Sequence, residues 1–395
     1  MRRFAMAMAL LAAGGSSGGA ALAADAAAGS FPKALAEEPI PAVEKLPAQW
    51  PASWMLVHDF HFSSILDGRV MVVDTASTER PIRGMVRAAQ FANMLVSPSR
   101  REILTSETFY SRLTQGVRTD VVTIWDMATL LPKGEIVMPG GKRQQSVTYP
   151  QVFQFTNDQK WALVANFTPA QSVSVLDLDA RKMIAEIDLP GCAHLYPTGK
   201  RGFSSLCADG SLLSVNLGPD GKAVASKTVE NIHDVDKQPM FGTPAWQGQT
   251  AWFVSYYGRL QAFDFSGDVG KALPGAFDLG SAEGAAPEWR PGGWQVIATD
   301  TAGKLYVLMS PNGREGSHKD GGTEVWVADP ATKTRTARIA LRSLATAIGL
   351  TKEAKPQLIV ARADGEIDVH DAATGTFVRS LGKAGGDNPL VITAP

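Results

Sequence analysis

Two cysteines and six histidines are the residues with the clearest capacity for chemistry in this 395-residue sequence. Cys192 and Cys207 are its only cysteines. An even pair in an exported chain forms a disulfide, whereas in a reducing compartment the same pair would serve redox or metal chemistry. Because the N-terminus carries a leader for export (below), we predict a Cys192–Cys207 disulfide worth about 3 kcal/mol. A reactive or metal-binding thiol pair is the alternative.

The histidines do not form a recognisable metal site. Only His58 and His61 are close in sequence, and no cysteine or carboxylate cluster joins them at metal-ligand spacing. We therefore predict no metal, with the histidines hydrogen-bonded at strand edges. After the leader there is no G-x-S-x-G nucleophile elbow, and no glycine-rich stretch lies between a strand and a helix to hold phosphate. A self-contained hydrolase or lyase is disfavoured.

A repeated strand phrase indicates the elements that carry these residues. An apolar-x-apolar stretch that ends in Asp or Asn recurs about every 50 residues and runs into a polar turn and a returning strand. The copies end at Asp74, Asp126, Asp177, Asn216, Asp264, Asp329 and Asp371. Repeats of this length with about four strands are typical of a β-propeller. We predict an all-β fold, a seven-bladed β-propeller over residues 52–395.

The N-terminal segment is interpreted as a targeting signal followed by an arm, and not as part of the propeller. Arg2 and Arg3 precede a short apolar run that ends in an A-x-A-type site at residues 21–23, which predicts a secretory signal peptide over residues 1–23. Residues 24–51 are expected to be a proline-rich arm, either disordered or packed on a partner. No later apolar run is long enough for a membrane helix. The net charge of −1 provides no basic footprint for nucleic acid.

Aromatic residues are the remaining candidates. Trp289 and Trp294 flank an Arg-Pro-Gly-Gly turn, where burial of two indoles demands a specific partner surface. Phe60 and Phe62, with His61 between them, precede the first repeat phrase, which ends at Asp74. A large exported scaffold that lacks a nucleophile, metal site and cofactor motif is expected to be one half of an assembly.

Several stretches, taken in order, resemble the heavy subunit of the quinoprotein amine dehydrogenases. They are GVRTDVVTIWD, NFTPAQSVSVLDL, the PGC…LCADGSLLSVNLG segment with both cysteines, FVSYYGRLQAFDFSGD, WRPGGWQ, and SPNGREGSHK followed by EVWVADPATKT. The stretches DGSLLSVNLGPDGK, FVSYYGRLQAFDFSGD, SPNGREGSHK and EVWVADPATKT are more similar to the aromatic amine branch than to the methylamine branch.

The resemblance implies a periplasmic complex of two heavy and two light subunits. In that family, tryptophan tryptophylquinone and the catalytic base belong to the light subunit, so this chain would bind no cofactor itself. Primary amines are oxidised to aldehyde and ammonia, and electrons pass to a blue-copper protein of the azurin or amicyanin type. This chain would be the non-catalytic subunit.

One residue of this chain is assigned a role by the resemblance. By its position after Asp59, Phe62 matches a phenylalanine that lines the substrate channel, where an aromatic ring selects by size and stacking. Its alternative is an ordinary core phenylalanine. For the whole chain, the alternatives are a methylamine dehydrogenase heavy subunit and a non-enzymatic periplasmic propeller that binds a ligand or partner.

Overall fold

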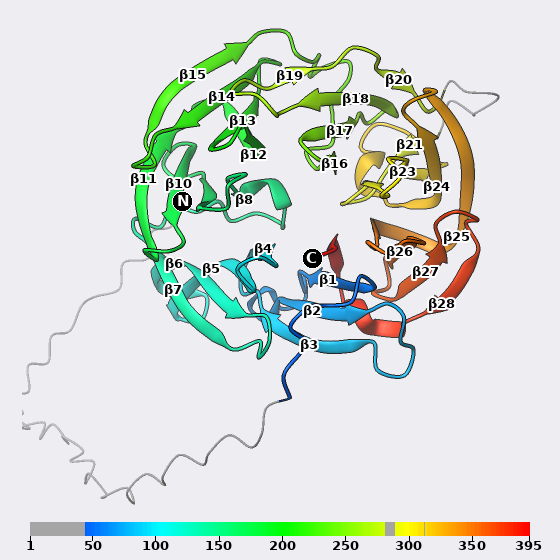
Figure 1. The fold of residues 1–395 in the computed structure, drawn as a ribbon, viewed down its shortest axis with the longest axis horizontal. Helices are drawn as coiled ribbons and strands as arrows, with labels where there is room; N and C mark the ends of the chain where they lie inside the picture. The colour runs from blue at the N-terminus through cyan, green and yellow to red at the C-terminus, as the bar shows by residue number, and fades with distance from the viewer. Residues whose placement is uncertain (1–43, 281–288, 312) are drawn as a thin grey trace, which may run out of the picture. The chain divides into compact units, whose positions relative to one another are not determined.

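The computed structural model describes residues 44–280, 289–311 and 313–395, which form an all-β propeller with almost no helix. Its sheets are arranged around a centre, with the chain running from sheet to sheet (Figure 1). The first sheet joins the two ends of the described chain. Its order is β29 (Pro389–Thr393), β1 (Trp54–Asp59), β2 (Arg69–Asp74) and β3 (Ile82–Arg87).

Four further sheets are separate antiparallel units, each in sequence order. The second contains β4 (Asn93–Ser97), β5 (Glu102–Arg112), β6 (Gln115–Asp126) and β7 (Pro132–Met138). The third contains β8 (Phe153–Phe155), β9 (Trp161–Asn166), β10 (Ser172–Asp177) and β11 (Lys182–Asp188). The fourth contains β12 (Cys192–Thr198), β13 (Gly202–Cys207), β14 (Leu212–Leu217) and β15 (Ala223–Val229). The fifth contains β16 (Ala245–Gln247), β17 (Thr250–Val254), β18 (Arg259–Asp264), β19 (Lys271–Ala272) and β20 (Phe277–Asp278).

The sixth sheet has eight strands and corrects the predicted blade count. Its members are β21 (Arg290–Pro291), β22 (Ile297–Thr299), β23 (Leu305–Ser310), β24 (Gly322–Asp329), β25 (Thr334–Leu350), β26 (Gln357–Arg362), β27 (Ile367–Asp371) and β28 (Phe377–Ser380). The long strand β25 pairs with β24 through its first half and with β26 through its second half. The propeller prediction is confirmed, but the described residues form five separate blades and one eight-stranded sheet instead of seven separate blades. The reason is that no turn interrupts β25, so the repeats ending at Asp329 and Asp371 share one sheet.

Apolar side chains from neighbouring sheets fill the space between them, as expected for face-to-face sheet packing. Trp161 on β9 and Val175 on β10 pack in one cluster with Leu195 on β12 and Phe203 on β13. All four are fully buried. This continuous packing makes the strand framework a rigid support for the connections on its two sides.

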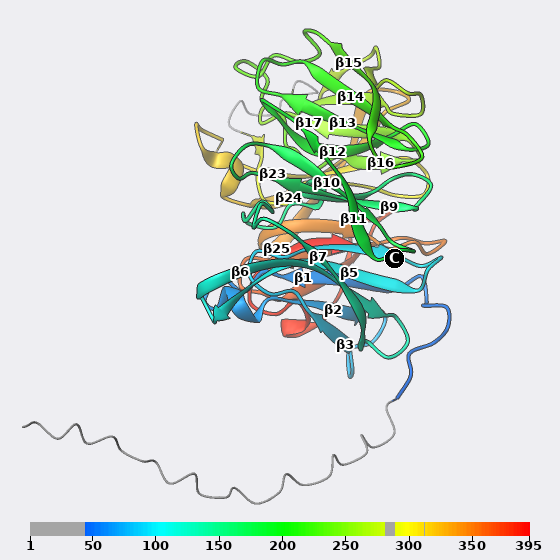
Figure 2. The ribbon, with the colours of Figure 1, turned by 90° about the vertical axis from the view of Figure 1, so that its left-hand side faces the viewer.

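The two sides of the framework carry different connections, and we name them separately. The turn face carries the turns that begin at Asp74, Asp126, Asp177, Asp264, Asp329 and Asp371. The loop face, opposite, carries the β1–β2, β5–β6, β9–β10, β17–β18 and β23–β24 connections. It also carries the short 3-10 helices η1 (Ile65–Asp67), η2 (Pro150–Val152), η3 (Ser317–Lys319) and η4 (Gly382–Gly385). The end of the β5–β6 hairpin and η3 project on the same side in Figure 2.

The repeated aspartates complete the turns of the turn face. Asp371 accepts hydrogen bonds from the backbone N–H groups of Ala373 (3.0 Å) and Thr374 (2.8 Å). Asp177 accepts the equivalent bonds from the N–H groups of Asp179 and Ala180. A side-chain oxygen in this position imitates a backbone turn and pairs N–H groups that the sheet cannot pair. The aspartate at the end of each phrase is therefore structural.

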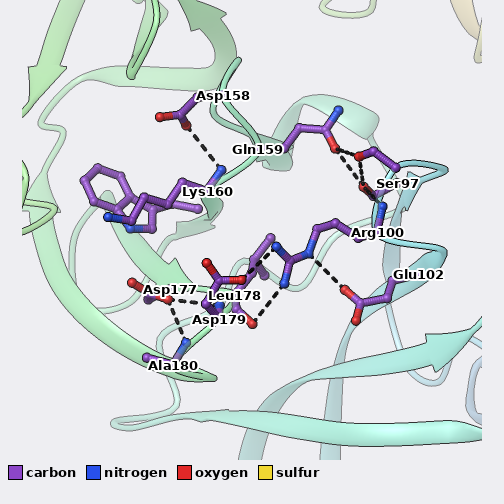
Figure 3. A network of polar contacts seen from close by, with 12 residues as sticks. Ser97, Arg100, Glu102, Asp158, Gln159, Lys160, Asp177, Leu178, Asp179 and Ala180 are labelled. Carbon is purple, nitrogen blue, oxygen red and sulfur yellow. Dashed lines mark hydrogen bonds and ion pairs between the residues drawn. The ribbon is translucent and has the colours of Figure 1, made fainter.

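Polar contacts also connect neighbouring sheets on the turn face (Figure 3). Arg100 lies between β4 and β5 and donates to Glu102 (3.1 Å) in its own sheet and to Asp179 (2.9 Å) in the next. Beside it, the Ser97 hydroxyl donates to the side-chain oxygen of Gln159 (2.7 Å). These contacts join the second and third sheets and satisfy the polar groups within this chain.

The leader over residues 1–23 and most of the arm lie outside the described residues. The described part of the arm packs on this chain's own core: Leu46 and Trp50 contact the cluster around Trp54, and the Leu46 N–H donates to the Ala128 carbonyl (2.8 Å). Across the described ranges, no helix has the length and apolar character to cross a membrane.

Candidate functional site

The loop face is distinguished by apolar side chains that point into solvent. Of the fourteen large hydrophobic residues that are exposed in the described chain, half lie on this face. These are Phe62, Phe109, Leu113, Val117, Phe167, Tyr257 and Leu344. On the turn face there is Leu131, and the others lie on the outermost strands. Large exposed apolar side chains that share one face make the loop face the candidate interaction surface.

Leu113 is the most unusual member of this set. It forms the tip of the β5–β6 hairpin with a φ of 61°, and 77% of its surface is exposed. The left-handed region favours glycine, asparagine or aspartate over a leucine, although Leu130 on the turn face also adopts it, with a φ of 56°. The exposed apolar side chain of Leu113 makes it a candidate contact residue on the loop face.

Buried charges hold the base of this hairpin. Arg143 is 2% exposed and donates two hydrogen bonds to the Thr108 hydroxyl (2.7 and 3.0 Å). Asp120 on β6 accepts from the Arg143 backbone N–H (3.0 Å), from Arg118 (2.9 Å) and from the Thr108 hydroxyl (2.7 Å). Burial lowers the pKa of Arg143 to about 10, which leaves it charged at neutral pH. The paired charges fix the hairpin against the sheet, so that Leu113 is presented on a rigid element.

A hollow of about 980 Å³ lies beside the hairpin on the same face. Its walls come from the β1–β2 connection, from β3 and from the hairpin itself, and include His61, Arg69, Phe109, Tyr110 and Leu113. Both polar and apolar groups line it, which is the usual composition of a ligand or partner surface.

Phe62 follows His61, which lines this hollow, and does not belong to the core. Its side chain is 52% exposed, whereas Phe60, two residues earlier, is 3% exposed and packs in the core with Phe91. The rings of Phe60 and Phe62 are 4.7 Å apart. The core interpretation of Phe62 is therefore wrong, and its place on the loop face suits a residue that contacts a substrate or a partner.

The predicted disulfide is confirmed. Cys192 and Cys207 lie directly opposite each other on β12 and β13 and are bonded. Both are buried beside Leu195 and Phe203, so the bond joins two strands of one blade and is not available for redox exchange with a partner.

The histidines are distributed among separate environments. His58 is buried with its Nδ1 3.3 Å from the Thr148 hydroxyl, and burial lowers its pKa to about 4. His61 turns away from it and pairs with Asp387 (2.8 Å). The part of the chain that the structure describes contains no group of three or more His, Cys, Asp or Glu side chains placed to hold a metal ion.

Trp289 and Trp294 find their partner surfaces within this chain. Trp294 packs against Tyr149 at 4.5 Å and its indole N–H donates to the Thr148 carbonyl (2.5 Å). Trp289 packs on Trp326 at 5.4 Å, with the Arg338 guanidinium 4.8 Å above its ring. All of these contacts lie within this chain, so the two indoles are structural.

Comparison with known proteins assigns this chain to a family. The family model described as "Methylamine dehydrogenase heavy chain (MADH)" matches residues 54–395. The chain belongs to the methylamine dehydrogenase heavy-chain family. It is similar to the methylamine dehydrogenase heavy chain of Paracoccus versutus, with 30% identity over 91% of this chain and 81% of that protein. The heavy chain of Methylorubrum extorquens is 29% identical over 85% of this chain and 80% of that protein.

Solved structures support the fold alone. A functionally unknown protein from Desulfotomaculum acetoxidans covers 87% of this chain and 99% of its own, with a TM-score of 0.57 and 14% identity. A dihydro-heme d1 dehydrogenase covers 90% of this chain and 78% of its own, with a TM-score of 0.53 and 15% identity.

As a family member, this chain is the large subunit of an amine dehydrogenase complex, and the family implies a light-chain partner. The sequence analysis named Phe62 as a candidate and did not name Leu113 or the other exposed apolar residues of the loop face. An apolar residue in a short hairpin tip between β5 and β6, where turn residues are usual, was the available signal.

Proposed function

We propose that the loop face binds the light subunit of a periplasmic quinoprotein amine dehydrogenase, in a complex of two heavy and two light chains. The observation that carries this proposal is the concentration of exposed apolar side chains on one face of a rigid ring. Burial of such side chains against a partner is the main source of stability in permanent complexes.

The proposed division of labour places the redox chemistry in the light subunit. Tryptophan tryptophylquinone, when present in that subunit, supplies the electrophilic carbonyl and accepts the two electrons of amine oxidation. Four of this chain's nine tryptophans have structural places that support this division: Trp161 and Trp326 are fully buried, and Trp289 and Trp294 are packed against this chain's own residues. The heavy chain holds the light subunit and keeps bulk water from the substrate.

Phe62 is proposed to wall the substrate channel at the edge of the light subunit. Its phenyl ring is exposed and lies on the loop face, among the other exposed apolar side chains, and both facts support this role. An aromatic ring there carries no proton and contributes only shape, stacking and exclusion of water. It would therefore affect which amine reacts and leave the chemical step to the partner.

For the substrate we propose primary amines of the aromatic or aralkyl class, on the sequence stretches that are more similar to the aromatic amine branch. Methylamine is the second candidate, favoured by the names of the relatives above, which are methylamine dehydrogenase heavy chains. The products would be the aldehyde and ammonia. We propose a blue-copper protein of the azurin or amicyanin type as the electron acceptor, and removal of residues 1–23 on export.

The experiment is to produce this chain with its light subunit and to compare the Phe62→Ala complex with the wild-type complex. We expect amine-dependent dye reduction only when both subunits are present. In the variant, the ratio of kcat/KM for an aromatic amine to that for methylamine should change by about tenfold. A lower ratio would indicate stacking of the substrate on the ring, and a higher ratio would indicate a steric gate.

The matched control is Leu131→Ala, an exposed apolar residue on the turn face, which should leave the ratio unchanged. An unchanged ratio in Phe62→Ala would contradict the channel role. Amine oxidation by the isolated chain would contradict the division of labour. Binding of a ligand by the isolated chain, with no light subunit recovered, would support a free-standing binding propeller instead.

A further inference from the structure

Two segments that are far apart in sequence meet at Phe62. The Phe62 backbone N–H donates to the side-chain oxygen of Asn388 (2.8 Å). The Phe60 N–H donates to the backbone carbonyl of the same asparagine (3.1 Å). Asn388 lies just before β29, the last strand, so the end of the chain reaches back to the connection between β1 and β2. One residue thereby contacts the backbone on both sides of His61.

A buried carboxylate holds the two segments together. Asp59 is 0% exposed and accepts hydrogen bonds from the backbone N–H groups of Asn388 (2.8 Å) and Asp387 (3.2 Å). It also accepts one from the N–H of His61 (3.0 Å), and the guanidinium of Arg69 is 3.8 Å away. A carboxylate that accepts several backbone N–H groups forms strong, charge-assisted hydrogen bonds. Asp59 is therefore the common anchor of both segments.

Two backbone features show how tightly the segments fit. Gly386 has a φ of 80°, and a side chain there would overlap the Asp59 carboxylate. His61 has a φ of 55°, in the left-handed region that residues other than glycine adopt uncommonly. Its ring nitrogen Nε2 is 2.8 Å from the Asp387 carboxylate, which is a further tie between the segments.

The side chain of Phe62, by contrast, is held by little else. About half of it is exposed, and its ring neighbour is Phe60. The direction of the ring therefore depends on the backbone of residue 62, and that backbone is held by the Asn388 side chain. Loss of this hydrogen bond would release Phe62 and leave Phe60 in the core.

We propose that Asn388 is a positioning residue for Phe62 and thereby helps to set the amine preference of the complex. This inference rests on the proposed function, because it requires Phe62 to wall the substrate channel. Asn388 itself touches no substrate. A shift of a channel residue by a fraction of an ångström is enough to change reactivity, because catalysis depends on near-attack geometry.

The test is a double-mutant cycle in the assembled complex, with the ratio of kcat/KM for an aromatic amine to that for methylamine as the readout. We expect Asn388→Ala to change the ratio by about threefold, in the same direction as Phe62→Ala, as one net hydrogen bond would. Asn388→Asp keeps an oxygen acceptor for the Phe62 N–H and should behave as the wild type. The Phe62→Ala/Asn388→Ala variant should match Phe62→Ala alone.

The outcomes separate this inference from the proposed function. If Phe62→Ala changes the ratio and Asn388→Ala does not, the positioning role is wrong and the channel role stands. If neither variant changes it, both are overturned. If the two effects add in the double variant, Asn388 acts independently of Phe62, and the positioning role is again wrong. Should Asn388→Ala fail to fold, Asn388→Ser, whose hydroxyl is too short to reach, takes its place in the same cycle.

Discussion

The turn face and the loop face of this propeller lie at opposite ends of the same strands. They differ in whether their side chains find partners within this chain. On the turn face, aspartates pair the backbone N–H groups of their own turns, and arginine ion pairs connect neighbouring sheets. On the loop face, seven large apolar side chains stay in solvent. The first surface is complete in a single chain, whereas the second has apolar groups without a cover. This difference supports the proposal that the partner binds the loop face.

Ionisable residues follow the same division. His58, near the loop-face end of β1, is buried, and burial lowers its pKa to about 4. Asp371, on the turn face, has its pKa held below its usual value by the N–H and hydroxyl of Thr374. The two residues should therefore affect stability in different ranges of pH, which separates the two sides of the molecule experimentally.

The largest predicted effect is acid destabilisation through His58. The folded chain keeps this histidine neutral, whereas the unfolded chain takes up a proton as the pH falls below about 6.5. The stability contributed by the neutral residue is fully present above pH 6.5 and is lost as the pH falls toward 4. We expect His58 to contribute a loss of about 3 kcal/mol over this interval, measured as the difference between wild type and a His58 variant in the free energy of unfolding in urea at a series of pH values. His194, whose pKa burial lowers to about 4, and Glu107, whose pKa burial raises to about 7, add contributions of opposite sign that are common to both proteins.

The variant His58→Gln should remove the contribution of His58 to this pH dependence and leave the contributions of His194 and Glu107, whatever it does to stability at neutral pH. As the matched control from the other face, Asp371→Asn should leave the slope between pH 6.5 and 4 unchanged. An identical slope in wild type and His58→Gln would contradict the prediction.

An intermediate effect is expected at the partner surface. Leu113→Asn removes an exposed apolar side chain and places at φ 61° a residue that tolerates this conformation. We expect the affinity for the light subunit to fall about tenfold, while the stability of this chain stays equal or rises. Equilibrium binding and urea unfolding measure the two quantities separately.

Leu131→Asn is the matched variant on the turn face, where the leucine is 47% exposed. It should leave the affinity unchanged. Equal losses of affinity in both variants would remove the distinction between the faces, and no loss in either would place the partner elsewhere.

The smallest effect is expected from a single turn aspartate. Asp371→Ala removes the acceptor of three hydrogen bonds around Thr374 and should lower the free energy of unfolding by about 1 kcal/mol. Asp371→Asn keeps an oxygen in the same place and should lose less. Neither should alter light-subunit binding. A change in binding would show that the turn face also takes part in the partner surface.

Local patterns predicted the strands, the turns and the disulfide. The alternation of apolar residues and the aspartate at the end of each phrase are properties of neighbouring residues, so they can be read without the fold. The joining of two repeats through β25 was missed because a strand that continues through a blade boundary differs from a turn only in its three-dimensional path. The tryptophans around Arg290 were expected to need a partner surface, and the chain itself provides it.

The sequence by itself determined the all-β repeat, the pairing of Cys192 with Cys207 and the family resemblance, because each depends on residue types at fixed spacing. Only the tertiary structure decided that Phe62 is exposed while Phe60 is buried, since strand alternation alone does not say where a connection leaves the core. It also decided that Asn388 lies beside Phe62, 326 positions away, because ring closure brings the chain's last strand to its first. Burial and long-range contacts are properties of the folded chain, and the proposed site depends on both.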